Sequence, residues 1–323
     1  MKSLVYHRYL RKSNHGINKS MPLNNIHVFT DIDLDGAASL LVLHHALKAK
    51  PGELSVSIST VTKLRQTVTL WLQDHKFEDY KTVFFMDHDT SELADLMDLP
   101  NVVVIDHHLS HVQALGVYKQ AQLFVQETTS CAKLAYHIFK PKLTHLTDAQ
   151  KYLVGLADDY DCFKFALPET YDLNCLFTNT QRAGQQTRTD RFIERFYNGF
   201  DGFNIQESNI IKNYKRLRDL EIESCKIYAG DIPIGGAKHR VVATFGSKFT
   251  NDVCEYLIKQ GGAEIAIFYN MNSNHVSFRK ASICPVDLSK LAEKLCGGGG
   301  HEYAAGGVNT PELQAFVNLL DQV

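Results

Sequence analysis

The sequence predicts an α/β protein of two domains, and three observations support this fold class. The chain has 323 residues, of which 44% are hydrophobic and 22% charged, which is enough for two compact domains with sizeable cores. In the first half, short continuous apolar runs alternate with helical patterns, as is typical of a parallel sheet covered on both faces. A long charged amphipathic stretch then interrupts this pattern, and a second alternating region follows it. We therefore expect a parallel-sheet N-terminal domain and a smaller α/β C-terminal domain.

The first domain is expected to begin with a buried strand that runs directly into an acidic turn and a helix. This helix has small and apolar residues at helical spacing and is ended by Pro51-Gly52. The same succession of strand and helix recurs along the next hundred residues. Strands are expected at residues 26–30, 56–61, 82–86 and 102–105, and helices at 37–48, 64–75, 130–139 and 148–157.

The second domain is expected after a connecting helix within residues 205–228. Its predicted strands are 241–245, 264–269 and 275–279, and its predicted helices are 251–260 and 288–295. We place the domain boundary in the region 200–230. The expected organisation is a basic N-terminal extension (1–23), a first domain (24–200), a connecting segment (201–230) and a second domain (231–323).

Composition excludes several classes of protein. The formal net charge of −2 argues against binding along long stretches of nucleic acid, which needs many contacts to phosphates. No run approaches 18 apolar residues, so we expect no membrane span. The seven cysteines are dispersed without a CxxC pair, which is typical of reduced thiols in the cytoplasm. The basic stretch 1–23 lacks the apolar region of a secretory signal, and we expect a cytoplasmic protein.

Four acidic segments carry the chemistry that the sequence suggests. They are Asp31-x-Asp33-x-Asp35-Gly36, Asp87, Asp106-His107-His108 and Asp158-Asp159-Tyr160-Asp161. The first three follow predicted strands, and the carboxyl ends of parallel strands meet at one edge of a sheet. Carboxylates gathered there repel one another unless a cation lies between them. Oxygen ligands with few imidazoles suit Mn²⁺ or Mg²⁺, and there are enough ligands for two ions and for metal-assisted hydrolysis of a phosphate ester.

The order and spacing of these segments resemble the motifs of the DHH phosphoesterase superfamily. The run Val104-Ile105-Asp106-His107-His108 matches the signature triplet without a gap, and residues 30–36 are similar to the first motif of RecJ-type exonucleases and short-oligonucleotide nucleases. Asp87 fits the second motif. For the fourth motif Asp159 aligns best, with Asp158 and Asp161 as alternatives.

The resemblance implies a role for each matching residue. Two Mn²⁺ ions are implied as cofactors, with Mg²⁺ or Co²⁺ as substitutes. Asp106 would orient His107, and His108 would contact the scissile phosphate, so Asp106 and His108 are the expected catalytic residues. The implied metal ligands are Asp31 and Asp33 for one ion, Asp35, His107 and Asp159 for the other, and Asp87 as a bridge between them.

The second domain carries a further resemblance. Gly298-Gly299-Gly300-His301, followed by Ala304-Ala305-Gly306, is similar to the Gly-Gly-Gly-His motif of the DHH-associated C-terminal domain. Ser277-Phe278-Arg279 resembles the strand that supplies the substrate-binding arginine of that domain. Backbone N–H groups of glycines can approach a phosphate, and an arginine can grip it with two donors. The resemblance implies that Arg279, Gly298, Gly299, Gly300 and His301 bind substrate, with the metal site in an inter-domain cleft.

These features favour a phosphodiesterase that hydrolyses short oligonucleotides or linear dinucleotides to mononucleotides, as nanoRNase-like members do. Manganese pyrophosphatases have a different C-terminal signature, and full RecJ exonucleases are longer and carry an added oligonucleotide-binding barrel. The alternatives are a cyclic dinucleotide or 3'-phosphoadenosine 5'-phosphate phosphoesterase, a RecJ-like exonuclease, an exopolyphosphatase, and a degenerate nucleotide-binding relative without activity. The expected partner is a short nucleic acid or dinucleotide, without a membrane, and a homodimer is compatible with the sequence.

Overall fold

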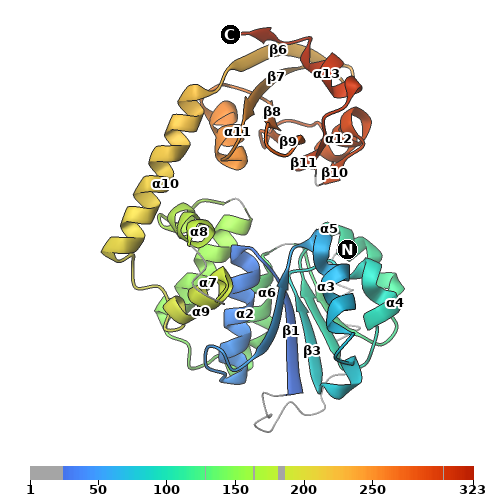
Figure 1. The fold of residues 1–323 in the computed structure, drawn as a ribbon, viewed down its shortest axis with the longest axis vertical. Coiled ribbons are helices and arrows are strands. Elements are labelled where there is room, and N and C mark those ends of the chain that lie inside the picture. The colour runs from blue at the N-terminus through green and yellow to red at the C-terminus, as the bar shows by residue number, and fades with distance from the viewer. Residues whose placement is uncertain (1–24, 128, 163, 181–185, 301) are drawn as a thin grey trace. The chain divides into compact units, whose positions relative to one another are not determined.

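The computed structural model describes residues 25–127, 129–162, 164–180, 186–300 and 302–323. The chain forms two compact domains, one ending at Ile211 and one comprising Lys212–Val323 (Figure 1). The division falls inside the long helix α10 (Ile205–Ser224). The predicted N-terminal extension lies outside the described residues.

The N-terminal domain contains a five-stranded parallel sheet, which confirms the predicted fold class. The strand order is β2-β1-β3-β4-β5, and all neighbouring strands run parallel. Their carboxyl ends therefore lie along one edge, which is the arrangement the acidic motifs require. The strands are β1 (Ile26–Asp31), β2 (Ser55–Ser59), β3 (Thr82–Met86), β4 (Val102–Asp106) and β5 (Gln122–Val125).

Helices cover both faces of this sheet (Figure 1). One face packs Phe29 and Phe85, whose rings stack with centroids 4.7 Å apart, against Leu64 and Val68 of α3 and Met97 of α4. On the other face lie α2, α6 and α7. The helices of this domain are α2 (Leu34–Leu47), α3 (Leu64–Trp71), α4 (Ala94–Met97), α5 (Leu109–Ala114), α6 (Cys131–Phe139), α7 (Asp148–Asp161), α8 (Thr170–Asn179) and α9 (Arg188–Phe196).

Apolar and β-branched runs explain why the central strands form where they were predicted. All residues of β1 except the last are buried, as are the last four of β3, because both strands are covered on two sides. Two differences matter for the site. Strand β5 was not predicted, since it is a short edge strand with no fully buried residue. Helix α7 extends to Asp161, four residues beyond the predicted end.

The C-terminal domain contains a separate, mixed sheet of seven strands. The strand order is β10-β11-β9-β8-β7-β6-β12, in which β7 and β8 run parallel and the other pairs antiparallel. Strand β6 was not predicted, because Gly230 and Pro233 indicate a loop. The strands are β6 (Ile227–Ile234), β7 (Ala237–Gly246), β8 (Ile265–Asn270), β9 (His275–Lys280), β10 (Gly299–Gly300), β11 (Ala304–Val308) and β12 (Asp321–Gln322).

Helices also pack on this second sheet. Helix α11 (Thr250–Lys259) places Val253 and Leu257 against Phe268, and helix α12 (Leu288–Cys296) packs with Phe278 in a second buried cluster. The remaining helix is α13 (Pro311–Val317). Among the described residues, no helix combines the length and the apolar character needed to cross a membrane.

Candidate metal centre

The first acidic motif lies at the carboxyl end of β1, where the chain turns into α2. Asp31 is the last residue of the strand, and its Oδ1 accepts a hydrogen bond from the backbone N–H of Ile32 at 2.5 Å. Asp33 is the N-cap of α2 and accepts a hydrogen bond from the N–H of Gly36 at 2.9 Å. One turn therefore presents three carboxylates, those of Asp31, Asp33 and Asp35, at the sheet edge.

Asp35 is buried and held by a second helix from far along the chain. Its carboxylate accepts hydrogen bonds from the backbone N–H groups of Cys131 at 2.6 Å and Ala132 at 2.9 Å. These are the first two residues of α6, so the carboxylate lies at the positive end of the helix dipole. The contact fixes the position of Asp35 relative to the other strands.

Asp87 directly follows β3 and has an unusual backbone conformation. Its φ angle is 61°, in the left-handed region that non-glycine residues seldom occupy. Its backbone N–H donates to the carbonyl of Ile105 on β4 at 3.0 Å, and its side chain is buried. Strained backbone that the surroundings hold in place is common at functional sites, and here it directs the carboxylate of Asp87 toward His107.

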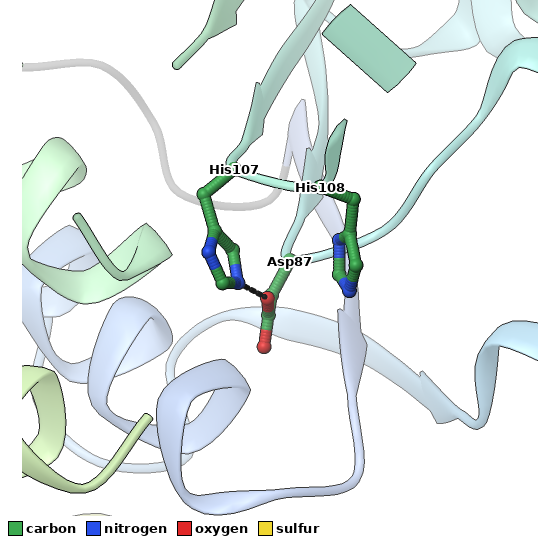
Figure 2. A group of neighbouring side chains, drawn as sticks. All are labelled: Asp87, His107 and His108. Carbon is green, nitrogen blue, oxygen red and sulfur yellow. Dashed lines mark ion pairs between the residues drawn. The ribbon is translucent and has the colours of Figure 1, made fainter. Parts of the chain in front are cut away.

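His107 follows β4 and is where the carboxylates converge. Its Nε2 atom is 3.3 Å from Oδ1 of Asp87, 3.7 Å from Oδ2 of Asp35 and 3.6 Å from Oδ2 of Asp161. Figure 2 shows the imidazole pointing at Asp87, with His108 beside it on the same turn. We name Asp31, Asp33, Asp35, Asp87, His107 and Asp161 the acidic cluster.

The fourth motif differs from the sequence alignment. The structure brings Asp161, which was an alternative, next to His107, and it does not bring Asp159 there. Both oxygens of Asp159 accept hydrogen bonds within the following loop, from the N–H groups of Ala166 and Leu167 at 3.0 Å each and from Thr170 Oγ1 at 2.6 Å. Asp159 therefore holds the 166–170 turn, and the carboxylate of this motif that faces His107 is that of Asp161.

Asp158, the other alternative, also has a structural role. Its Oδ1 accepts from the N–H of Ser130 at 3.1 Å, and its Oδ2 pairs with Lys164 at 2.8 Å. Ser130 is the N-cap of α6, whose first N–H groups hold Asp35. Asp158 thus supports the helix end that positions a member of the acidic cluster.

Asp106 is fully buried and pairs with two histidines, whereas the resemblance implied that it orients His107. Its Oδ1 lies 2.7 Å from Nδ1 of His108, and its Oδ2 lies 2.7 Å from Nδ1 of His111. The network continues from His111 Nε2 to the hydroxyl of Tyr118 at 2.9 Å. His111 and Tyr118 were missed from the sequence. The spacing of His108 and His111, three residues apart across the start of α5, is the sequence signal that could have revealed His111.

The pKa shifts of Asp106 and His108 distinguish these two residues from the acidic cluster. Burial alone would lower the pKa of His108, but the hydrogen bond to Asp106 and its charge outweigh burial and raise the pKa to about 9. Burial alone would raise the pKa of Asp106, but the bonds from His108 and His111 hold it well below its usual range. At neutral pH the pair is an ionised carboxylate beside a protonated imidazole.

The cluster carboxylates shift in the opposite direction. Burial and repulsion by Asp33 raise the pKa values of Asp31 and Asp161 to about 7. Burial and neighbouring carboxylates also raise the pKa values of Asp35 and Asp87. The cluster therefore cannot hold its full negative charge without a compensating cation.

The residues present fit divalent cations. The donors are carboxylate oxygens with the imidazole nitrogen of His107, and the ligand atoms of Asp35, His107 and Asp161 lie within 4.8 Å of one another. Oδ1 of Asp87 lies 3.3 Å from Nε2 of the same histidine. Oδ2 of Asp161 is buried and has no hydrogen-bond partner among the described residues, which is costly unless a cation binds it. The acidic cluster thus has the chemistry of a site for hard to borderline divalent ions.

The substrate-binding residues expected in the C-terminal domain lie on β9 and in the segment that forms β10, on either side of β11. Arg279 is on β9, pairs in register with Ala304 of β11, and donates from Nη2 to Oδ1 of Asn251 at 2.7 Å. Gly299 is open on its side-chain face, so its backbone is accessible. His301 lies outside the described residues.

Gly298 and Gly300 have a structural reason to be glycine. A Cβ atom on Gly298 would lie 2.0 Å from the carbonyl oxygen of Gly306, and one on Gly300 would lie 2.6 Å from that of Ala304. Gly300 also has a φ of 139°. The two glycines allow β10 to pack closely against β11, which presents the backbone of this segment at the sheet edge.

Solved structures share this fold at low sequence identity. The DHH domain of a member of a family of ribosomal proteins is 15% identical with a TM-score of 0.65, and 92% of this chain and 87% of that chain are covered. A pGpG-specific phosphodiesterase from Vibrio cholerae is 12% identical with a TM-score of 0.57, covering 91% and 98%. RecJ in complex with Mn²⁺ from Thermus thermophilus is 14% identical with a TM-score of 0.55, covering 91% and 50%. No curated protein matches this sequence.

Family models match both domains. Residues 25–158 match the N-terminal domain of the DHH family, and residues 241–323 match the DHHA1 domain. The first match contains Asp31 to Asp35, Asp87 and the triplet 106–108, and the second contains Arg279 and the glycine run. Together the two models match more than half of the chain, and the resemblance found in the sequence is confirmed. The chain is a member of the DHH family in which a DHH N-terminal domain is followed by a DHHA1 domain.

Proposed function

We propose that this protein is a Mn²⁺-dependent phosphodiesterase that hydrolyses short oligonucleotides or linear dinucleotides to mononucleotides. The observation that carries the proposal is the convergence of three carboxylates on one imidazole, with Nε2 of His107 within 3.3–3.7 Å of Asp35, Asp87 and Asp161. Such an arrangement, beside a protonated histidine, suits the hydrolysis of a phosphate ester.

The acidic cluster would hold two ions. Asp87 would contribute to both, because Nε2 of His107, 3.3 Å from Oδ1 of Asp87, also lies within 3.7 Å of Asp35 and Asp161. Asp161 replaces Asp159 in the ligand set that the sequence implied. When bound, the ions polarise the phosphoryl oxygens and lower the pKa of a water molecule.

His108 would act as a charged hydrogen-bond donor to the substrate phosphate. Its Nδ1–H donates to Asp106, and the raised pKa of about 9 keeps a second proton on Nε2 at neutral pH. Nε2–H is then a charged donor for a phosphate oxygen, and it stabilises negative charge that develops there. His111 and Tyr118 hold the other oxygen of Asp106 and so keep the carboxylate from rotating away.

The substrate class is supported by the DHHA1 domain and by one fold neighbour. Arg279 and the backbone around Gly299 would bind a terminal phosphate or nucleotide of a short substrate. One fold neighbour acts on the linear dinucleotide pGpG, and the chain covers 98% of that protein. The chain also covers 88% of one RecJ exonuclease chain and 50% of the RecJ chain from Thermus thermophilus. The pGpG-specific neighbour therefore supports substrates of a few nucleotides, and RecJ-like cleavage of long single strands is the alternative that the substrate panel tests.

A substrate panel at fixed Mn²⁺ tests the proposal. It contains a linear dinucleotide, a cyclic dinucleotide, 3'-phosphoadenosine 5'-phosphate, polyphosphate and a long DNA strand, each with and without chelator. We expect the linear dinucleotide to be hydrolysed with the highest kcat/KM, and chelator to abolish turnover. Faster cleavage of polyphosphate or of long DNA would replace the proposed substrate, and turnover of none would support a binding protein.

A further inference from the structure

A second group of side chains of the types that can bind a metal lies in the C-terminal domain, apart from every residue used above. His239 of β7, Glu264 just before β8 and Cys284 after β9 meet at one end of the mixed sheet. Nδ1 of His239 is 2.5 Å from Oε2 of Glu264 and 4.0 Å from Sγ of Cys284. All three ligand atoms lie within 4.8 Å of one another.

The backbone fixes each of these residues. The N–H of Glu264 donates to the carbonyl of Arg240 at 2.9 Å, and its own carbonyl accepts from Ala281 at 2.9 Å, so Glu264 is tied to segments on both sides. The N–H of Cys284 donates to the carbonyl of Ala281 at 3.0 Å, and this turn brings the thiol back over the strand ends. The site is therefore built by paired strands and one tight turn.

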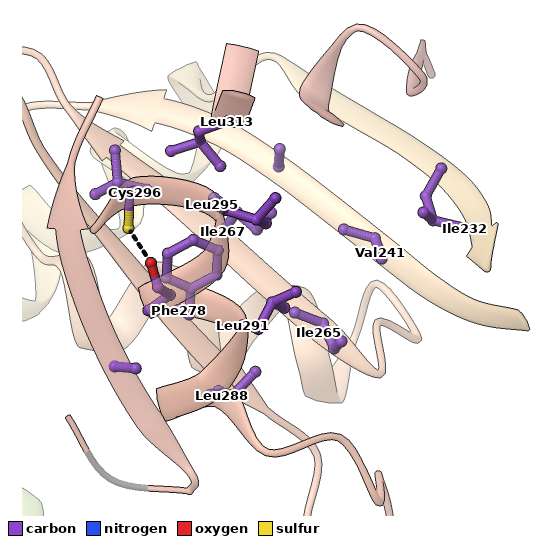
Figure 3. Packing of buried hydrophobic residues seen from close by; sticks show 14 of the residues in the cluster. Ile232, Val241, Ile265, Ile267, Phe278, Leu288, Leu291, Leu295, Cys296 and Leu313 are labelled. Atoms are coloured by element: carbon purple, nitrogen blue, oxygen red, sulfur yellow. Dashed lines mark hydrogen bonds between the residues drawn. The ribbon is translucent and has the colours of Figure 1, made fainter. Parts of the chain in front are cut away.

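The surroundings are mostly apolar. His239 pairs in register with Ile232, and Cys284 belongs to the same buried cluster as Ile232, Val241 and Ile265. Figure 3 shows Ile232, Val241 and Ile265 on the strands of this core. His239 and Cys284 are buried, and Glu264 covers them with a side chain that is 39% exposed. A cation there would be shielded from water on the inner side and accessible from the outer side.

We propose that His239, Glu264 and Cys284 form a binding site for a borderline-soft divalent cation, of which Zn²⁺ is the best fit. One thiolate, one imidazole and one carboxylate are all ligands of Zn²⁺, and the thiolate disfavours Mg²⁺ and Mn²⁺. Bond lengths of about 2.0 Å to N and O and about 2.3 Å to S place tetrahedral ligand atoms roughly 3.2–3.7 Å apart. The separation of His239 and Cys284 is close to this, and the exposed Glu264 side chain can move outward.

Three protein ligands leave the fourth position of a tetrahedral ion for water or an external ligand. The ion would bind the thiolate of Cys284, whose proton passes to solvent, and Nδ1 of a neutral His239 that carries its proton on Nε2. The bound ion would join two strands to the turn 281–284 and so stabilise this end of the DHHA1 domain. This inference does not depend on the proposed phosphodiesterase activity.

Cobalt substitution tests the site, because a thiolate bound to Co²⁺ has a near-ultraviolet charge-transfer band that carboxylate and imidazole ligands do not produce. We expect Co²⁺ to generate this band in the full-length protein and Zn²⁺ to remove it by competition, whereas Mg²⁺ does not. The variants Cys284→Ser and His239→Ala should lose the band, and Zn²⁺ affinity at this site should fall at least about tenfold. Cys254→Ser is the matched control, since Cys254 is a buried cysteine of the same domain.

A measurement on the unaltered chain covers the case in which a variant fails to fold. Zn²⁺ should protect Cys284 from alkylation, as read by mass spectrometry, and leave the labelling of Cys225 unchanged. A band that persists in Cys284→Ser, or the absence of both band and protection in the unaltered protein, would overturn the site and leave His239 and Glu264 as a structural ion pair.

Discussion

The two domains each bring titratable side chains together from separate segments, but they do so with different chemistry. In the N-terminal domain the carboxyl ends of parallel strands gather carboxylates, and Nε2 of His107 lies within 3.7 Å of three of them. In the C-terminal domain a strand, a strand start and a turn gather one residue each of His, Glu and Cys. The first group suits hard ions and has excess negative charge, whereas the second suits a softer ion.

The comparison shows how sheet topology decides what a sequence can reveal. A parallel sheet places its motifs at equivalent points of successive strands, so that the pattern is visible along the chain. A mixed sheet joins residues by register and by turns, so His239, Glu264 and Cys284 share no motif. The following predictions test whether the two groups differ as their ligands indicate.

The largest effect is expected from Asp87→Asn. A ligand that contacts both proposed ions cannot be replaced by a neutral amide without loss of both, so phosphodiesterase activity should fall by at least about 100-fold. Steady-state kinetics on a linear dinucleotide with Mn²⁺ measures this. Asp148→Asn is the control, because Asp148 is an exposed residue at the start of α7. A variant at Asp87 with near-normal activity would contradict the two-metal assignment.

The next effect separates Asp161 from Asp159. Asp161→Asn should weaken Mn²⁺ binding by roughly 10- to 100-fold, because its carboxylate faces His107. Asp159→Asn should leave Mn²⁺ affinity within about threefold but lower the melting temperature, since it breaks the contacts that hold the 166–170 turn. Calorimetric Mn²⁺ titration and thermal unfolding of both variants test this. The reverse pattern would restore Asp159 as the ligand.

An effect of similar size, but on substrate and not on metal, is expected in the C-terminal domain. Arg279→Ala should lower kcat/KM on a dinucleotide by about 10- to 150-fold, the loss of one charge-assisted contact of roughly 1.5–3 kcal/mol. Mn²⁺ affinity should stay unchanged, because a guanidinium has no lone pair for a cation. On a small ester such as bis-p-nitrophenyl phosphate the defect should shrink. Equal loss on both substrates would mean that Arg279 supports the fold.

The smallest effect concerns stability of the metal-free protein. The folded pKa of Asp161, about 7, lies above its usual value of 3.8, so the folded state binds more protons than the unfolded state between these pH values. The stability of the unaltered protein should therefore fall as pH rises through this window. Asp161→Asn has no carboxylate to ionise in the folded state. Its free energy of unfolding should therefore exceed that of the unaltered protein by about 1–3 kcal/mol at pH 8 and should not differ below pH 4.

Urea unfolding at several pH values with chelator measures the difference. Added Mn²⁺ should reverse it, because the ion stabilises only the protein that keeps the full ligand set. A stability difference that does not change with pH would show that Asp161 is not held at raised pKa by its neighbours.

The sequence by itself determined the two-domain α/β class and most of the acidic cluster. Apolar runs marked β1, β3 and β4, and the residues after each run had to share one sheet edge because the strands are parallel. The segments that carry Asp31, Asp33, Asp35, Asp87 and His107 were expected at this edge for that reason, and the family resemblance implied their roles as ligands. The glycine run 298–300 was recognised as a motif, whereas the close pairing of β10 with β11 that its glycines allow became visible only in the structure.

Only the tertiary structure decided which carboxylate of the fourth motif joins the cluster. Helix α7 continues to Asp161, and residues three apart share a helix face, so Asp158 and Asp161 project toward the sheet edge together. Asp159 lies about 100° from the first and about 200° from the second, and turns toward the following loop instead. The predicted helix ended at residue 157 and left these aspartates outside it, so the sequence did not show which of them share a helix face. The partners of Asp106 and the group around His239 were also decided in space, because hydrogen bonds and strand register join residues that no sequence spacing connects.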